Sequence, residues 1–213
     1  MRRVTRRERR PQKLSVLLIV LALAFLSACG DNEVDVDDSL RSSGTDQFEI
    51  VEQDDGKYVV GHGIALEMGE GWTDYAEEQD STDGTTYEWA VGLPEDTKPV
   101  PAGLQFSMGK KGKGAPFKTL PDATRELAEL TPGYKMIDEG KADVPGAEDA
   151  AFLRFVQDFE LNGQTQRLEQ VQLMIKMPGG QNSVIRFIAA EGEWDKELEQ
   201  VYDSLVVTDS AST

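Results

Sequence analysis

The chain has 213 residues with 22 basic and 39 acidic side chains, which give a formal net charge of −17 at pH 7. A charge of this sign repels nucleic acid, anionic lipid headgroups and anionic wall polymers, so we expect no binding of nucleic acid and polyanion contacts only at a local basic patch. Cys29 is the only cysteine, which leaves no intramolecular disulfide, so a folded domain must depend on a hydrophobic core.

Residues 1–28 have the pattern of a secretory signal peptide. Six arginines and Lys13 precede the uncharged stretch Leu14–Ala28, and a basic segment followed by an apolar one is typical of export signals. As a helix these 15 residues would be about 22 Å long, which is shorter than the hydrocarbon layer of about 30 Å. The stretch is therefore too short for a permanent membrane span.

The residues around Cys29 indicate a lipid anchor. Ser27 and Ala28, immediately before Cys29, resemble the lipobox of bacterial lipoproteins. The resemblance implies cleavage before Cys29 and a diacylglycerol on its thiol, and two acyl chains hold a protein durably at a membrane. We therefore expect a protein anchored at the extracytoplasmic side of the cell membrane. An ordinary signal peptide with an incidental cysteine is the alternative.

The chain after the leader divides into a tether and a domain. Residues 29–47 are acidic and poor in large apolar groups, so they are predicted to form a flexible tether. The part after residue 28 has 15 basic and 38 acidic residues, about −23 in net charge, and 15 aromatic residues. Residues 48–213 are therefore expected to fold as one acidic domain, since 166 residues are too few for two.

The first half of this domain is predicted to be mainly β. Alternating apolar residues run over Lys57–Met68 and stop at Gly69–Trp72, and two more strands are expected over Thr85–Leu93 and Ala102–Met108. The intervening loops at 94–101 and 109–114 are rich in proline or glycine.

A helix is predicted to begin at Thr119. Thr119 and Asp122 fit a capping box, Pro121 is tolerated in the first turn, and Pro132-Gly133 ends the helix. Its apolar face, which we expect to lie on the sheet, contains Leu120, Ala123, Leu127 and Leu130.

The C-terminal part is predicted to be a three-stranded meander followed by a helix. The strands lie around Leu153–Leu161, Val171–Met177 and Val184–Ala190, and the Asn162-Gly163 pair favours a tight hairpin. We expect the meander to have one solvated face. Apolar residues over Trp194–Leu205 then follow a helical period, and Leu205–Thr208 is expected to add a short strand. Together these patterns predict an α+β domain with an antiparallel sheet flanked by helices.

This order of elements resembles the PsbP-like α/β/α sandwich, and in particular the actinobacterial LpqN-like lipoproteins and their DcrB-like relatives. The residues that carry the resemblance are Gly71-Trp72, Pro132-Gly133-Tyr134, Val144-Pro145-Gly146-Ala147 with Ala150, and Tyr202–Val207. The resemblance implies a small module that binds or assists other molecules, and it implies no shared catalytic residues.

The sequence offers few groups for catalysis or metal binding. His62 is the only histidine and no Gly-x-Ser-x-Gly motif accompanies it, so a serine hydrolase is disfavoured, and His62 is interpreted as a solvated strand-end residue. With Cys29 acylated, zinc also lacks ligands. Carboxylate pairs at Glu77-Glu78 and at Glu191 and Glu193 could serve a glycosidase, but such pairs arise by chance in an acidic chain. We therefore expect no catalytic residue, metal or cofactor.

Two surface features remain as candidate contact sites. A basic patch that could face anionic headgroups or an acidic partner contains Lys110, Lys111, Lys113 and Lys118. A possible amphipathic ligand groove contains Trp72, Tyr75, Tyr87 and Trp89. A solvated loop is the alternative for the lysines, and core packing is the alternative for at least two of the aromatic residues.

The leading hypothesis is a non-enzymatic lipoprotein of the cell envelope that binds an envelope protein or a small amphipathic ligand. An envelope hydrolase using carboxylates and a small solute-binding lipoprotein are the alternatives.

Overall fold

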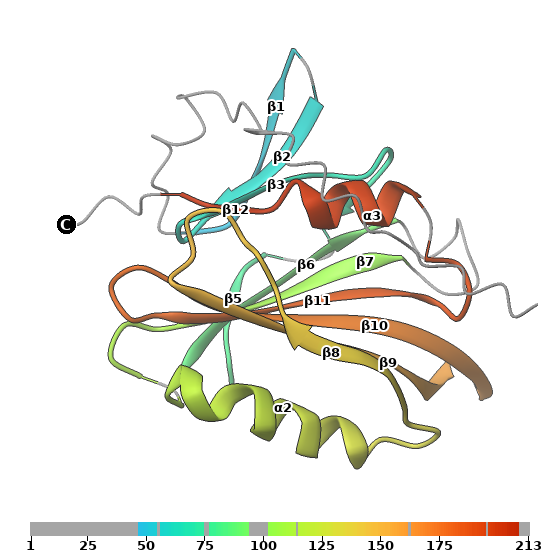
Figure 1. Cartoon of the computed structure of the whole chain (residues 1–213). Coiled ribbons are helices and arrows are strands. Elements are labelled where there is room, and N and C mark those ends of the chain that lie inside the picture. The colour runs from blue at the N-terminus through green and yellow to red at the C-terminus, as the bar shows by residue number, and fades with distance from the viewer. Residues whose placement is uncertain are drawn as a thin grey trace, which may run out of the picture. The chain divides into compact units, whose positions relative to one another are not determined.

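A computed structural model describes residues 47–54, 56–74, 77–93, 102–113, 115–161, 163–194 and 196–208. The predicted signal peptide, Cys29, most of the tether, Tyr75 and the loop at 94–101 lie outside these residues. The described residues form an α+β fold in which every paired strand is antiparallel (Figure 1). The predicted class, an antiparallel sheet flanked by helices, is confirmed.

The larger of the two sheets in the described residues has eight strands in the order β4-β6-β7-β11-β10-β9-β8, with β5 paired to β6. The strands are β4 (Thr73–Asp74), β5 (Gln79–Asp80), β6 (Thr86–Gly92), β7 (Gly103–Gly109), β8 (Lys135–Lys141), β9 (Asp149–Leu161), β10 (Gln164–Lys176) and β11 (Asn182–Ala190). The predicted strands at Thr85–Leu93 and Ala102–Met108 and the predicted meander are therefore confirmed. In the meander Leu161 pairs with Gln164, so β9 and β10 are joined by the expected two-residue turn.

Two helices cover opposite faces of this sheet (Figure 1). Helix α2 (Leu120–Glu129) lies over one face, where Ala128 packs with Leu153, Phe155 and Met174. Helix α3 (Lys196–Asp203) lies over the other face, where Leu198, Val201 and Leu205 join a larger core with Ile185 and Phe187. The helix predicted over Trp194–Leu205 is thus confirmed for Lys196–Asp203, and Trp194 and Leu205 lie just outside it.

The expectation of one solvated face for the meander is wrong. Val171 pairs directly with Arg154, so these two side chains share a face, and the neighbouring Leu153 and Phe155 point to the opposite one. The side chains of Leu153, Phe155 and Val171 are all buried. Apolar residues of both parities are therefore covered, one set by α2 and the other by the main core.

The smaller sheet packs on the same side as α3. It contains β1 (Glu49–Gln53), β2 (Gly56–Gly61), β3 (Ile64–Glu67) and β12 (Val206–Val207) in the order β1-β2-β3-β12. Val59, Ile64 and Leu66 from this sheet and Phe106 from the larger sheet belong to the main core. Strand β12 confirms the predicted strand at Leu205–Thr208.

The alternating stretch Lys57–Met68 forms a hairpin and not one strand. β2 and β3 pair with each other, and between them His62 and Gly63 have φ angles of 49° and 78°. Two consecutive residues with positive φ make the tight turn that matches the twist of a hairpin. This turn places the only histidine of the chain between two strands.

Helix α2 begins where the sequence predicts, but without the predicted cap. The Thr119 hydroxyl donates to the carbonyl of Pro116 at 3.0 Å, and no side chain caps the helix. A single 3₁₀ turn over Phe117–Thr119 leads into α2, so the Thr119 hydroxyl is directed to the preceding turn. The capping box is therefore not formed, whereas proline is present in the first turn as expected.

Candidate binding surfaces

The predicted aromatic groove is not formed by its tryptophans. Trp72 and Trp89 are 2% and 7% exposed and belong to the main core, where Trp89 stacks on Phe48 at 5.4 Å between ring centroids. Tyr87 is half-buried, and Tyr75 lies outside the described residues. The structure thus places both tryptophans in the main core, where Trp89 packs against Phe48 and Phe106.

His62 lies in a packed environment and not at a solvated strand end. Its ring stacks on Tyr87 at 4.6 Å and meets the edge of Phe48 at 5.0 Å. Its Nε2 lies 2.8 Å from a carboxylate oxygen of Glu78, and both side chains are 7% exposed. The same Glu78 oxygen accepts the backbone N–H of Phe48 at 2.9 Å. Glu78 thus holds the backbone at Phe48, and the imidazole of His62 is engaged in a structural contact.

The other candidate carboxylates are dispersed. Glu191 accepts a hydrogen bond from Arg167 at 3.3 Å, and Arg167 also donates to Asp158 at 2.7 Å. Glu193 and Glu77 are exposed. Among the described residues no group of three His, Cys, Asp or Glu side chains is arranged to hold a metal ion.

The lysines of the predicted basic patch differ in their environment. Lys110 pairs with Asp80 at 2.7 Å and lies 4.5 Å above the ring of Tyr87. Lys113 donates to the carbonyl of Gly84 at 3.5 Å, while Lys111 and Lys118 are exposed. The patch is therefore partly neutralised, and its net attraction for an acidic partner is weaker than the sequence suggests.

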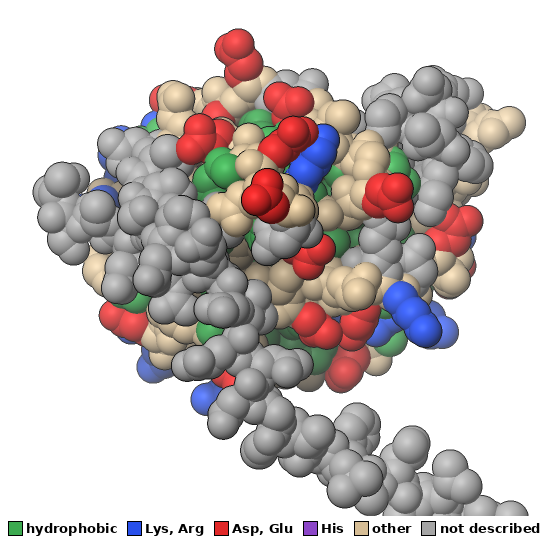
Figure 2. Space-filling view, turned by 90° about the horizontal axis from the view of Figure 1, so that it is seen from above, with side chains coloured by type: hydrophobic (Ala, Val, Ile, Leu, Met, Phe, Trp, Pro, Cys, Tyr) green, Lys and Arg blue, Asp and Glu red, His purple; other side chains and the backbone are tan. Residues whose placement is uncertain are grey.

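An open groove of about 630 Å³ lies between the β2–β3 hairpin and α3. Lys57 and Lys196 face it together with Glu67 and Glu70. Lys57 is also paired with Glu52 at 2.9 Å. Seen from above, the described part of this side has several scattered acidic side chains and few basic ones among them (Figure 2).

Helix α2 exposes most of the apolar face that was predicted to lie on the sheet. Leu127 and Leu130 are 68% and 81% exposed, and Ala123 is exposed as well. The buried positions are instead Thr124 and Ala128. The helix is therefore rotated by about one residue, or about 100°, from the predicted orientation.

The outer stripe of α2 is bordered by acidic groups. Asp122, Glu126 and Glu129 are exposed on the same helix. The one basic residue of α2, Arg125, donates to Glu139 of β8 at 2.7 Å and to Asp122 at 3.3 Å, so its charge is already compensated. The surface presented by α2 is thus two large leucines within a negative border. We define the outer stripe as Ala123, Leu127 and Leu130.

A signal for the buried face of α2 was present in the sequence. Leu120, Thr124 and Ala128 are spaced by four residues and so lie on one helix face. Thr124 and Ala128 are small and let the helix approach the sheet closely, while Leu120 packs against the same cluster at the first turn. This face is less apolar than the outer stripe, so apolar periodicity alone does not identify it.

Comparison with known proteins finds solved structures with a similar fold. No family model matches the chain, and a search of curated proteins finds no relative. Among solved structures the chain is similar to LpqN of Mycobacterium tuberculosis, described as involved in cell envelope biogenesis, with a TM-score of 0.48 and 19% identity over 76% of this chain and 91% of that one.

Two other solved structures are similar to the chain at lower scores. A protein from Bacteroides thetaiotaomicron has a TM-score of 0.42 and 14% identity, over 68% of this chain and 45% of that one. PA94 of Pseudomonas aeruginosa, a protein of unknown function, has a TM-score of 0.35 and 14% identity, over 68% of this chain and 83% of that one. At these identities the likeness concerns the fold and not an activity.

Proposed function

We propose that this chain is a lipid-anchored module at the extracytoplasmic side of the cell membrane that binds an envelope protein and catalyses no reaction. The location is supported by the basic-then-apolar leader and by Ser27 and Ala28 before Cys29. Among the described residues no helix is long and apolar enough to cross a membrane. In this proposal diacylated Cys29 supplies the membrane attachment.

The observation that carries the binding role is the outer stripe of α2. An apolar side chain exposed to water costs about 25 cal/mol per Å² relative to its burial, so Leu127 and Leu130 favour a contact that covers them. Exposed apolar groups with a polar border are typical of protein-binding surfaces. The acidic border selects a partner with basic residues around its own apolar side chains.

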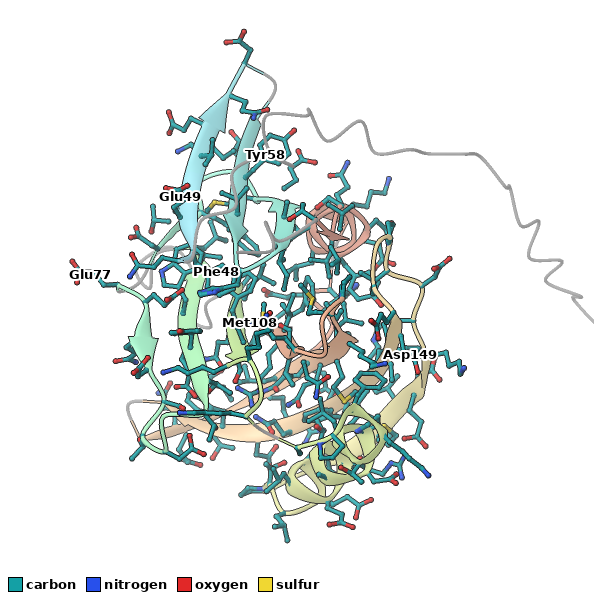
Figure 3. All side chains as sticks on the ribbon, turned by 90° about the vertical axis from the view of Figure 1, so that its left-hand side faces the viewer. Phe48, Glu49, Tyr58, Glu77, Met108 and Asp149 are labelled. Carbon is teal, nitrogen blue, oxygen red and sulfur yellow. The ribbon has the colours of Figure 1, made fainter. Side chains whose placement is uncertain are left out.

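Two measurements test the two halves of this proposal. Cys29→Ala is expected to release the protein from the membrane fraction, and unchanged membrane fractionation would contradict the anchor. A photo-crosslinking residue at position 130 is expected to form a defined adduct with an envelope protein in intact cells. The same residue at position 49 serves as a control, since Glu49 is exposed on β1, far from α2 (Figure 3).

The double variant Leu127→Ser, Leu130→Ser separates binding from folding. Because position 130 is changed in this variant, the crosslinking residue is placed at position 123, which also belongs to the outer stripe and should give the same adduct in the otherwise unchanged protein. Both leucines are largely exposed, so thermal stability of the double variant should be nearly unchanged while the adduct from position 123 is lost. An adduct that persists in this variant would show that the outer stripe is not the contact surface.

The open groove between the β2–β3 hairpin and α3 favours a second candidate, binding of a small amphipathic ligand. Its volume of about 630 Å³ lies in the range of ligand sites, and Lys57 and Lys196 could contact a polar headgroup. The test is whether the wild-type protein retains a component of a lipid extract. Retention that is lost in the double variant Lys57→Gln, Lys196→Gln would favour this function over protein docking.

A further inference from the structure

The part of the large sheet that α2 leaves uncovered has an ordered pattern of side chains. The cluster beneath α2 draws on β8, β9, β10 and β11, and within the described residues it includes nothing from β6 or β7. Strand register aligns the uncovered side chains in two rows on this face. One row contains Gln79, Glu88 and Ser107, and the next contains Ala90, Gln105, Arg186 and Gln172.

Short side chains in these rows create a hollow. Ala90 and Ser107 occupy adjacent rows between the longer side chains of Glu88, Gln105 and Arg186. Because neighbouring strands are about 4.8 Å apart, two short residues side by side leave a space that the longer ones border. The resulting pocket has a volume of about 220 Å³ and is lined by these five residues together with Glu77, Gln79, Trp89 and Phe106.

Arg186 is the one cationic residue that lines this pocket. Its side chain is half-buried, and no described acidic residue forms an ion pair or hydrogen bond with it. Burial lowers the pKa of the Arg186 guanidinium, and the charge of Glu88 offsets only part of this effect. A partly desolvated guanidinium with no ion-pair partner among the described residues gains from an anion that supplies hydrogen bonds.

The other described arginines of the domain have such partners. Arg154 donates to Glu169 at 2.7 Å, Arg125 to Glu139 at 2.7 Å and Arg167 to Asp158 at 2.7 Å. Arg186 is therefore the exception among them, and it is the one that faces a pocket.

We infer that this pocket is a binding site for a single carboxylate group, held by the guanidinium of Arg186 with Gln105 and Ser107 as additional hydrogen-bond donors. The planar fork of a guanidinium matches a carboxylate through two parallel hydrogen bonds. The volume of the hollow suits one such group. Glu88 and Glu77, which also line the pocket, oppose multiply charged anions such as phosphate. Glu77 lies at the edge of the molecule in Figure 3.

The test is a titration of the full-length protein in a nonionic detergent, followed by NMR of the arginine Nε–Hε resonances. The probe is N-acetylglycine, and N-acetylglycinamide is the matched ligand without a charge. The acid is expected to shift the Arg186 resonance in a saturable manner, and the amide to leave it unchanged. Inorganic phosphate is expected to bind at least about tenfold more weakly than the acid, since both of its charges meet Glu88.

Two variants separate the site from a general charge effect. Arg186→Gln is expected to weaken binding of the acid at least about tenfold, as lost charged hydrogen bonds do. Arg125→Gln removes the same charge from a compensated arginine and should leave binding unchanged. Equal responses to acid and amide, binding that persists in Arg186→Gln, or an equal loss in Arg125→Gln would overturn the inference. Thermal unfolding of both variants establishes that they remain folded.

Discussion

His62 and Glu78 are 16 residues apart in sequence, and their side chains meet at 2.8 Å between Nε2 and Oε2 in a nearly solvent-free position. The contact joins the β2–β3 turn to the segment before β5. Because the same Glu78 oxygen accepts the N–H of Phe48, it also fixes the residue at which the predicted tether ends. One carboxylate thus connects three parts of the chain.

The first prediction follows from this convergence. Glu78→Ala leaves the Phe48 N–H and the His62 ring without their acceptor, and is expected to lower the free energy of unfolding by about 2 kcal/mol. Glu78→Gln keeps one acceptor oxygen and should lose less. Urea denaturation measures both. The neighbouring Glu77→Ala is the control, since Glu77 is exposed and its loss should change stability by less than about 0.5 kcal/mol. Equal losses in Glu77→Ala and Glu78→Ala would contradict the role of the contact.

A second prediction concerns Gly146, which precedes the meander. Its φ is 80°, and a Cβ at this position would overlap the carbonyl oxygen of Val207 in β12. The neighbouring Pro145 carbonyl accepts the N–H of Val207 at 2.8 Å, so the two segments cannot move apart without breaking this bond. Gly146→Ala is therefore expected to destabilise the protein by about 3 kcal/mol, as measured by thermal unfolding.

Gly179 provides the matched control for this variant. Its φ is 84°, but a Cβ there would meet nothing within 4 Å. Gly179→Ala should therefore show only the cost of a positive φ, about 1 kcal/mol. If both alanine variants lose the same stability, the close approach of Gly146 to β12 contributes nothing.

The contrast between α3 and α2 shows how much could be predicted from the sequence. In α3 the buried positions Leu198 and Val201 follow the helical period, and few other apolar residues compete with them. In α2 two neighbouring faces both contain apolar residues. The more apolar face, the outer stripe, is exposed to solvent, while Thr124 and Ala128 on the other face are buried. Periodicity identifies a helix in both cases, but the face is chosen by how closely the backbone can approach the sheet.

The surroundings of His62 and Arg186 could not be predicted for a different reason. His62 meets Glu78, which is 16 residues away in sequence, and strand register places Arg186 between Gln105 and Gln172. The alternation of apolar residues indicates which side of a strand is buried, but it does not indicate which strands are neighbours in the sheet. The meander strands were predictable because their turns are short and local, whereas the pairing of β11 with β7 joins segments about 80 residues apart.

A third prediction concerns acid conditions and Asp83. Hydrogen bonds from the Thr85 hydroxyl, the Thr85 N–H and the Ser81 hydroxyl lower the pKa of Asp83 from 3.8 to about 2. Because the folded-state pKa lies below the unfolded-state value, the stabilising effect is present above pH 3.8 and is lost as the pH falls toward about 2. An NMR titration of the Asp83 carboxyl carbon should give the lowered pKa directly. In Thr85→Val the side-chain donor is absent, and the pKa should move back toward 3.8; an unchanged midpoint would contradict the assigned cause.

The last prediction tests the orientation of α2, on which the proposed binding surface depends. Ala128 is packed against Phe155 and Met174, so Ala128→Leu adds volume to a filled site and is expected to destabilise the protein by about 2 kcal/mol. Leu127→Ala removes a side chain that is 68% exposed and should cost less than about 0.5 kcal/mol. The orientation predicted from the apolar stripe alone would reverse this order, because a buried Leu127 would then lose about 2 kcal/mol or more on truncation. Chemical denaturation of the two variants therefore decides which face of α2 is available to a partner.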